Sequence, residues 1–113
     1  MLTVEKLKEY GADTQDGLAR CMGNEALYLR LVSTVASQTD FVKLKDSVAS
    51  GDLKSGFEAA HALKGVLGNL SLTPLYDKVS EITELLRART ETDYTLLLND
   101  IEALRDGLGK LAE

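Results

Sequence analysis

Apolar residues recur at helical spacing along most of this chain, separated by charged and polar residues. In two segments of the last third they stand four, three and four positions apart, the spacing of one buried stripe on an α-helix. These stripes are Leu75, Val79, Ile82 and Leu86 in the first segment, and Leu97, Ile101, Leu104, Leu108 and Leu111 in the second. The pattern predicts two amphipathic helices, joined by a loop over residues 88–92.

Residues that favour helix ends divide the middle of the chain. Gly51 followed by Asp52 predicts the end of one helix at a C-cap glycine and the start of the next at an N-cap aspartate. This next helix is expected over residues 53–70. After it, Thr73 and Pro74 predict the N-cap and first-turn proline of the following helix.

The amino-terminal part predicts shorter elements, over residues 3–10 and 15–22. Asn24 is a good N-cap for a longer helix that packs inside a bundle, with the stripes Leu27, Leu31, Val35 and Tyr28, Val32, Ala36. A phase shift over residues 38–40 predicts a kink or a helix boundary. Because short connections place successive helices antiparallel, we predict an all-α fold: an antiparallel four-helix bundle with one or two short N-terminal helices.

Composition limits the class of protein. A chain of 113 residues with 44% hydrophobic residues predicts a single domain over residues 1–113. The net charge of −5 argues against binding to nucleic acid, which is held by clustered Lys and Arg. No apolar run is long enough for a signal peptide or a membrane span, so we expect a cytoplasmic protein. Cys21 has no second cysteine to pair with and is expected to be buried, and no thiolate or imidazole metal cage is possible.

Candidate chemistry is concentrated around His61, the only histidine. On a helix, Lys64, Gly65 and Gly68 share the face of this ring. The apolar residues of the segment fall on the opposite side: Leu53, Ala60, Leu63, Leu67 and Leu70. Each glycine inside a helix costs roughly 1 kcal/mol relative to alanine. We therefore predict that bare backbone around an exposed imidazole lets another macromolecule approach the ring.

The pattern His-x-Leu-Lys-Gly, with a second glycine three positions on, resembles the signature of the histidine-containing phosphotransfer (HPt) domain. Residues 17–28 resemble the usual start of the second helix in that family, and residues 51–53 its lead into the histidine helix. The resemblance covers about residues 10–110. One departure is Ser71, near the place where many members carry a further glycine.

The resemblance implies a phosphocarrier of a multistep, two-component phosphorelay. His61 would accept a phosphoryl group on Nε2 from a receiver-domain aspartate and pass it to another receiver, with Lys64 stabilising the phosphate. The implied partners are receiver domains of response regulators and hybrid histidine kinases. No cofactor is expected on this chain, because the receiver would provide Mg²⁺. The chain has no nucleotide-binding glycine loop, so we do not expect an enzyme with its own ATP site, and we expect a monomer.

Five residues near His61 are predicted to contact the partner: Gly65, Gly68, Asn69, Phe57 and Lys54. Each has a plainer interpretation. The glycines can serve close helix packing, Asn69 and Lys54 can be ordinary surface residues, and for Phe57 we prefer packing against the adjoining helix. Glu58 could orient the ring through a hydrogen bond, although a solvated glutamate is the favoured interpretation.

Two other functions stay open at this point. The chain could be a helical adaptor that binds receiver domains without being phosphorylated, with an incidental His61. It could also be the HPt module of a larger hybrid or chemotaxis-type kinase.

Overall fold

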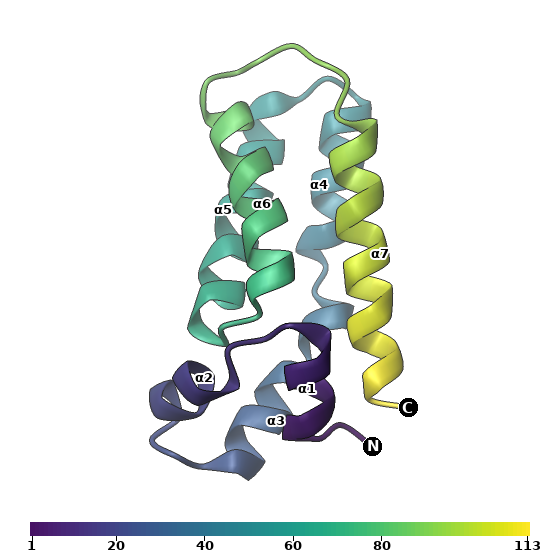
Figure 1. Ribbon diagram of the computed structural model, residues 1–113. Coiled ribbons are helices and arrows are strands. Elements are labelled where there is room, and N and C mark those ends of the chain that lie inside the picture. Colours follow the sequence, from purple (N-terminus) through teal and green to yellow (C-terminus); the bar gives the residue numbers. More distant parts are fainter.

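The computed structural model describes all 113 residues, and its regular structure is entirely helical (Figure 1). In chain order the elements are α1 (Val4–Tyr10), α2 (Thr14–Arg20), α3 (Glu25–Ser33), the 3₁₀ helix η1 (Val35–Ser37), α4 (Asp40–Ala49), α5 (Leu53–Asn69), α6 (Thr73–Arg87) and α7 (Thr95–Leu111). The predicted all-α class is confirmed.

Helices α4 to α7 form an antiparallel bundle, and α1 to α3 lie together across one of its ends (Figure 1). The predicted four-helix bundle is therefore confirmed. The short helices that precede it number three, however, because the helix after Asn24 ends at Ser33 and belongs to this amino-terminal group. The prediction that this helix packs inside the bundle was wrong.

Serine and threonine side chains give the reason for this early end. Thr34 Oγ1 donates a hydrogen bond to the Leu31 carbonyl at 2.7 Å, and Ser37 Oγ donates to the Thr34 carbonyl at 3.1 Å. Such local bonds compete with regular helix, and the chain passes into η1 instead. The buried face of this segment combines residues from both predicted stripes. Tyr28, Val32 and Val35 are buried, whereas Leu31 is 39% exposed.

Most of the predicted helix ends are confirmed. The Asn24 side chain accepts a hydrogen bond from the Leu27 amide at 3.0 Å, and Asp52 accepts one from the Ser55 amide at 3.1 Å. Thr73 was wrongly placed by one residue: Leu72 is the N-cap, and Thr73 and Pro74 lie in the first turn. The chain reverses sharply at Ser71, so α6 has already begun at Thr73.

The core confirms the predicted apolar faces of α5 and α6. The fully buried apolar side chains in these two helices are Ala60, Leu63, Leu67, Leu75, Val79, Ile82 and Leu86. In α7 only Ile101 and Leu108 are buried, and the rest of its stripe packs at the edge. Cys21 is a buried free thiol, as expected. None of the helices combines the length and the apolar character needed to cross a membrane.

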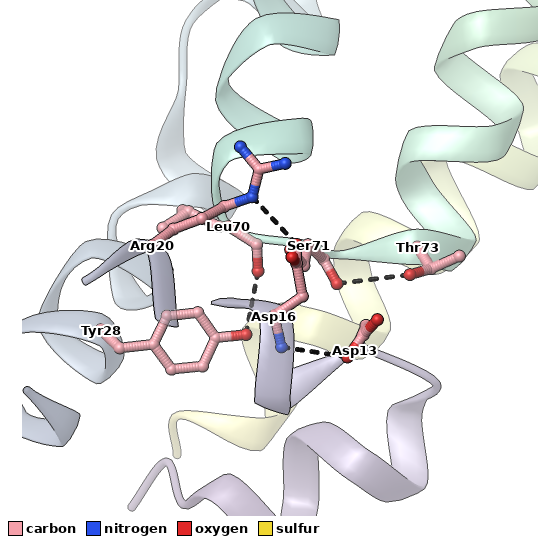
Figure 2. Close-up of polar contacts among 7 residues, drawn as sticks. All are labelled: Asp13, Asp16, Arg20, Tyr28, Leu70, Ser71 and Thr73. Atoms are coloured by element: carbon pink, nitrogen blue, oxygen red, sulfur yellow. Dashed lines mark hydrogen bonds and ion pairs between the residues drawn. The ribbon is translucent and has the colours of Figure 1, made fainter. Parts of the chain in front are cut away.

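The amino-terminal helices are joined to the end of α5 by a partly buried polar junction (Figure 2). Tyr28 Oη donates to the Leu70 carbonyl at 2.9 Å, and the Asp13 amide donates to the Ser71 carbonyl at 3.0 Å. The Ser71 hydroxyl also donates to the Asp16 carboxylate. These bonds hold α2 and α3 beside the carboxyl end of the histidine helix.

Ser71 has a left-handed backbone with φ of +54°. Glycine adopts this conformation most readily, and a serine here is less favourable for the backbone. The Ser71 side chain is held by the hydrogen bond that it donates to Asp16. That hydrogen bond, followed by the contact with Arg20, lowers the pKa of the Asp16 carboxyl below its usual value.

Tyr28→Phe is expected to lower the free energy of unfolding by about 1–2 kcal/mol, because the buried Leu70 carbonyl would lose its donor. Burial raises the pKa of Tyr28 to about 12, so the hydroxyl is a donor at neutral pH. Urea unfolding would measure the change. Tyr76→Phe is the control, since no hydrogen bond of its hydroxyl is seen. Equal midpoints for the two variants would contradict this role of Tyr28.

Candidate functional site

His61 lies near the middle of α5, with its side chain exposed to solvent. Ala60 and Leu63, on the other side of the helix, are fully buried. The predicted solvent-facing position of the imidazole is confirmed.

One side of the ring borders the line of contact between α5 and α6, which we call the α5–α6 seam. Three pairs of residues meet across this seam: Phe57 with Arg87, Lys64 with Glu84, and Gly68 with Tyr76. His61 stands on α5 between Phe57 and Lys64. The seam therefore brings residues of α6 to the residues that flank the histidine on α5.

Phe57 is the aromatic neighbour of the histidine. The ring centroids of Phe57 and His61 lie 5.7 Å apart, and the ring planes are inclined by 22°. The Arg87 guanidinium carbon lies 4.9 Å from the Phe57 centroid, so Phe57 packs against α6, the preferred interpretation of the sequence. Its stacking also restricts the orientation of the imidazole.

Lys64 is one turn beyond His61 and is held by a weak ion pair. Its Nζ lies 3.9 Å from Glu84 Oε1, and the other oxygen of Glu84 lies 3.2 Å from Arg87 Nε. The Glu84 side chain is 59% exposed. An exposed pair of this kind contributes about 0–1 kcal/mol. Little free energy is therefore lost when Lys64 leaves Glu84 for another anion.

The two glycines of the predicted site have different surroundings. A Cβ atom added to Gly65 would have no neighbour within 4 Å, whereas one added to Gly68 would lie 3.0 Å from Tyr76 Cε1. Gly65 leaves a patch of bare backbone beside His61. Gly68 permits close packing of Tyr76, the alternative purpose that the sequence left open.

An open groove of about 680 Å³ runs from His61 towards the amino-terminal helices. It is lined by residues of α2, α5 and the start of α6, among them Lys64, Gly65, Gly68 and Asn69, and most of its lining residues are of polar or charged type. A polar groove of this shape is suited to the surface of another macromolecule rather than to an apolar small ligand.

The remaining predicted residues lie at or beyond the edge of this groove. Lys54 is exposed two turns before His61, and Phe57 lies outside the groove lining. Glu58 is exposed to solvent, which agrees with the favoured interpretation. No group of three His, Cys, Asp or Glu side chains is arranged to hold a metal ion.

Sequence reasoning missed the contributions of α6 and α2. Tyr76, Glu84 and Arg87 share one face of α6, because they are spaced eight and three residues apart. A helical projection of residues 73–87 would have shown that face. It would not have shown that the face meets α5 beside His61. Asp16 and Arg20 of α2 border the groove only because of how the chain folds back.

Fold and site together define a helical-bundle protein with one solvent-exposed imidazole in the middle of a bundle helix. A family model described as the Hpt domain matches residues 31–113, which include His61 and Lys64. Because the match covers more than half of the chain, this protein belongs to the Hpt domain family. Hpt domains are phosphocarrier modules of phosphorelays and interact with receiver domains. Comparisons with curated proteins and with solved structures gave no match.

Proposed function

We propose that this protein is a phosphotransfer intermediate that receives a phosphoryl group from one receiver domain and passes it to another. The observation that carries the proposal is the exposed His61 ring in the middle of α5, beside Lys64 and the bare backbone of Gly65. This arrangement combines a nucleophile, a cation and room for a partner.

In the accepting step, the neutral Nε2 of His61 attacks the phosphorus of an aspartyl phosphate. The N–P bond forms as the bond between phosphorus and the aspartate oxygen breaks, and the carboxylate of the receiver leaves. The donating step is the reverse reaction with the aspartate of a second receiver. Catalysis of such a transfer is mainly alignment and charge neutralisation.

The residues of this chain divide these tasks. Phe57 orients the imidazole by stacking, and Gly65 keeps the approach open. Lys64 exchanges its weak contact with Glu84 for the phosphoryl oxygens. The receiver is proposed to supply Mg²⁺, so this chain needs no cofactor. A cytoplasmic location and a monomeric state stay predictions from the sequence.

The test is incubation with a phosphorylated receiver domain, followed by detection of label on this chain. Phosphohistidine is labile in acid and stable in base, so the expected label survives base and is lost in acid. Absence of such label would favour the adaptor that binds receivers without accepting phosphate.

Lys64→Ala is expected to slow phosphotransfer about 10–100-fold, because a charge-assisted hydrogen bond of about 1.5–3 kcal/mol is lost in the transition state. Affinity for the receiver should change little. Rapid-quench kinetics and a separate binding titration would distinguish the two effects. Lys78→Ala is a matched control. Lys78 Nζ lies 3.4 Å from Asp100 Oδ2, and this ion pair lies outside the groove. A transfer rate in Lys64→Ala equal to that of the control would remove Lys64 from the mechanism.

A further inference from the structure

Two arginine side chains lie over the ring of Phe57. The guanidinium carbons of Arg87 and Arg89 are 4.9 and 5.6 Å from the ring centroid. Both arginines are exposed to solvent. Phe57 also stacks on His61, so this one ring contacts both the two cations and the imidazole. We call Arg87, Arg89 and Phe57 the arginine shelf.

Most hydrogen-bond donors of the arginine shelf are unused within the protein. Arg87 uses Nε for Glu84 at 3.2 Å, and Arg89 uses one terminal nitrogen for the Leu86 carbonyl at 2.6 Å. A guanidinium has five N–H donors in a planar fork that matches a carboxylate. The shelf can therefore bind an anionic group from a partner without breaking its own contacts.

The backbone of Arg89 is left-handed, as it is at Met22 and Ser71. Its φ is +54°, in the left-handed region that glycine prefers. The amides of Arg89 and Thr90 donate back to α6 at 3.0 Å each, the arrangement that ends many helices with a glycine. An arginine in this place is less favourable for the backbone than glycine. Helix capping explains one of its hydrogen bonds but not its position over Phe57.

Charge differs between the two ends of the site. The shelf presents Arg87 and Arg89 on the Phe57 side of His61. The far end of the groove is bordered by Asp13, Asp16 and Asp77, and by one cation, Arg20, which pairs with Asp16 at 2.9 Å. A partner surface therefore meets mainly cations at one end and mainly carboxylates at the other. Electrostatic complementarity of this kind favours one orientation of docking.

We propose that the arginine shelf binds a carboxylate side chain on the surface of the receiver domain and sets the orientation of that domain over His61. This inference rests on the proposed phosphotransfer function. It identifies Arg87 and Arg89 as residues that select the partner, and Phe57 as the platform that holds them.

The test is phosphotransfer from a phosphorylated receiver, measured over a range of receiver and salt concentrations. Arg87→Gln combined with Arg89→Gln is expected to lower kcat/KM about tenfold, mainly through a higher KM, and to weaken the dependence on salt. The control combines Arg30→Gln with Lys43→Gln, which removes the same charge from exposed positions outside the groove. Equal kcat/KM in these two double variants would overturn the inference.

A conservative double variant and a small phosphoryl donor separate docking from other effects. Arg87→Lys with Arg89→Lys keeps the charge but loses the planar fork, so kcat/KM is expected between wild type and the Gln variant. Phosphoramidate needs no docking surface and should label His61 equally in wild type and in the Gln variant. Slower labelling by phosphoramidate in the variant would show an effect on the imidazole and would overturn the docking role. A wild-type chain labelled by phosphoramidate but by no receiver would instead refute the proposed function.

Arg89→Gly distinguishes a structural role from a docking role. Glycine suits the left-handed backbone, so the thermal midpoint is expected to stay equal or to rise, while KM for the receiver increases about threefold. A lower midpoint with unchanged KM would show that Arg89 only caps α6, and would remove it from the shelf.

Discussion

In His61→Gln, label transferred from a phosphorylated receiver is expected to fall to background, a loss of more than about 100-fold. Glutamine preserves polarity but has no nitrogen that can form an N–P bond. His61 is the only histidine, so no second imidazole can take the label. The measurement is quantification of acid-labile, base-stable label after incubation with the phosphorylated receiver.

The fold should not be affected by this change. The His61 side chain is exposed and makes only a stacking contact with Phe57, so the free energy of unfolding is expected to change by less than about 0.5 kcal/mol. A thermal unfolding curve of the variant is the control. Label on a folded His61→Gln variant at the wild-type level would exclude His61 as the acceptor.

Gly17→Ala is expected to destabilise the protein by about 2 kcal/mol, or roughly 8 °C in thermal midpoint. A Cβ atom at Gly17 would lie 2.6 Å from two carbons of the Tyr28 ring, and Tyr28 is completely buried and bonded to Leu70. The ring cannot retreat without breaking that junction. Overpacking is expected to destabilise the protein by about 3 kcal/mol. This loss exceeds the stabilisation of roughly 1 kcal/mol that alanine brings to a helix relative to glycine.

The same substitution at Gly65 should change the free energy of unfolding in the opposite direction. Gly65 also lies inside a helix, but an added Cβ meets nothing within 4 Å. Gly65→Ala is expected to stabilise the protein by about 1 kcal/mol. Chemical denaturation of both variants measures the difference. If both alanines stabilise, the Gly17–Tyr28 contact does not limit the packing of α2.

Local sequence patterns predicted the bundle well where one helix has one buried face. The stripe of Leu75, Val79, Ile82 and Leu86 is fully buried in α6, and Asp52 starts α5 as an N-cap. The prediction failed where competing local bonds decide the outcome. The stretch after Asn24 has a continuous apolar pattern, yet serine and threonine hydrogen bonds end α3 at Ser33.

The sequence by itself determined that His61, Lys64 and Gly65 share one exposed face, because the period of a helix relates residues three and four apart without reference to the rest of the chain. Only the tertiary structure decided that Glu84 holds Lys64, and that Arg87 and Arg89 lie over Phe57. These contacts cross from α5 to α6 and its loop. They depend on how the two helices are rotated and shifted against each other, which is a property of the packed core and not of either segment.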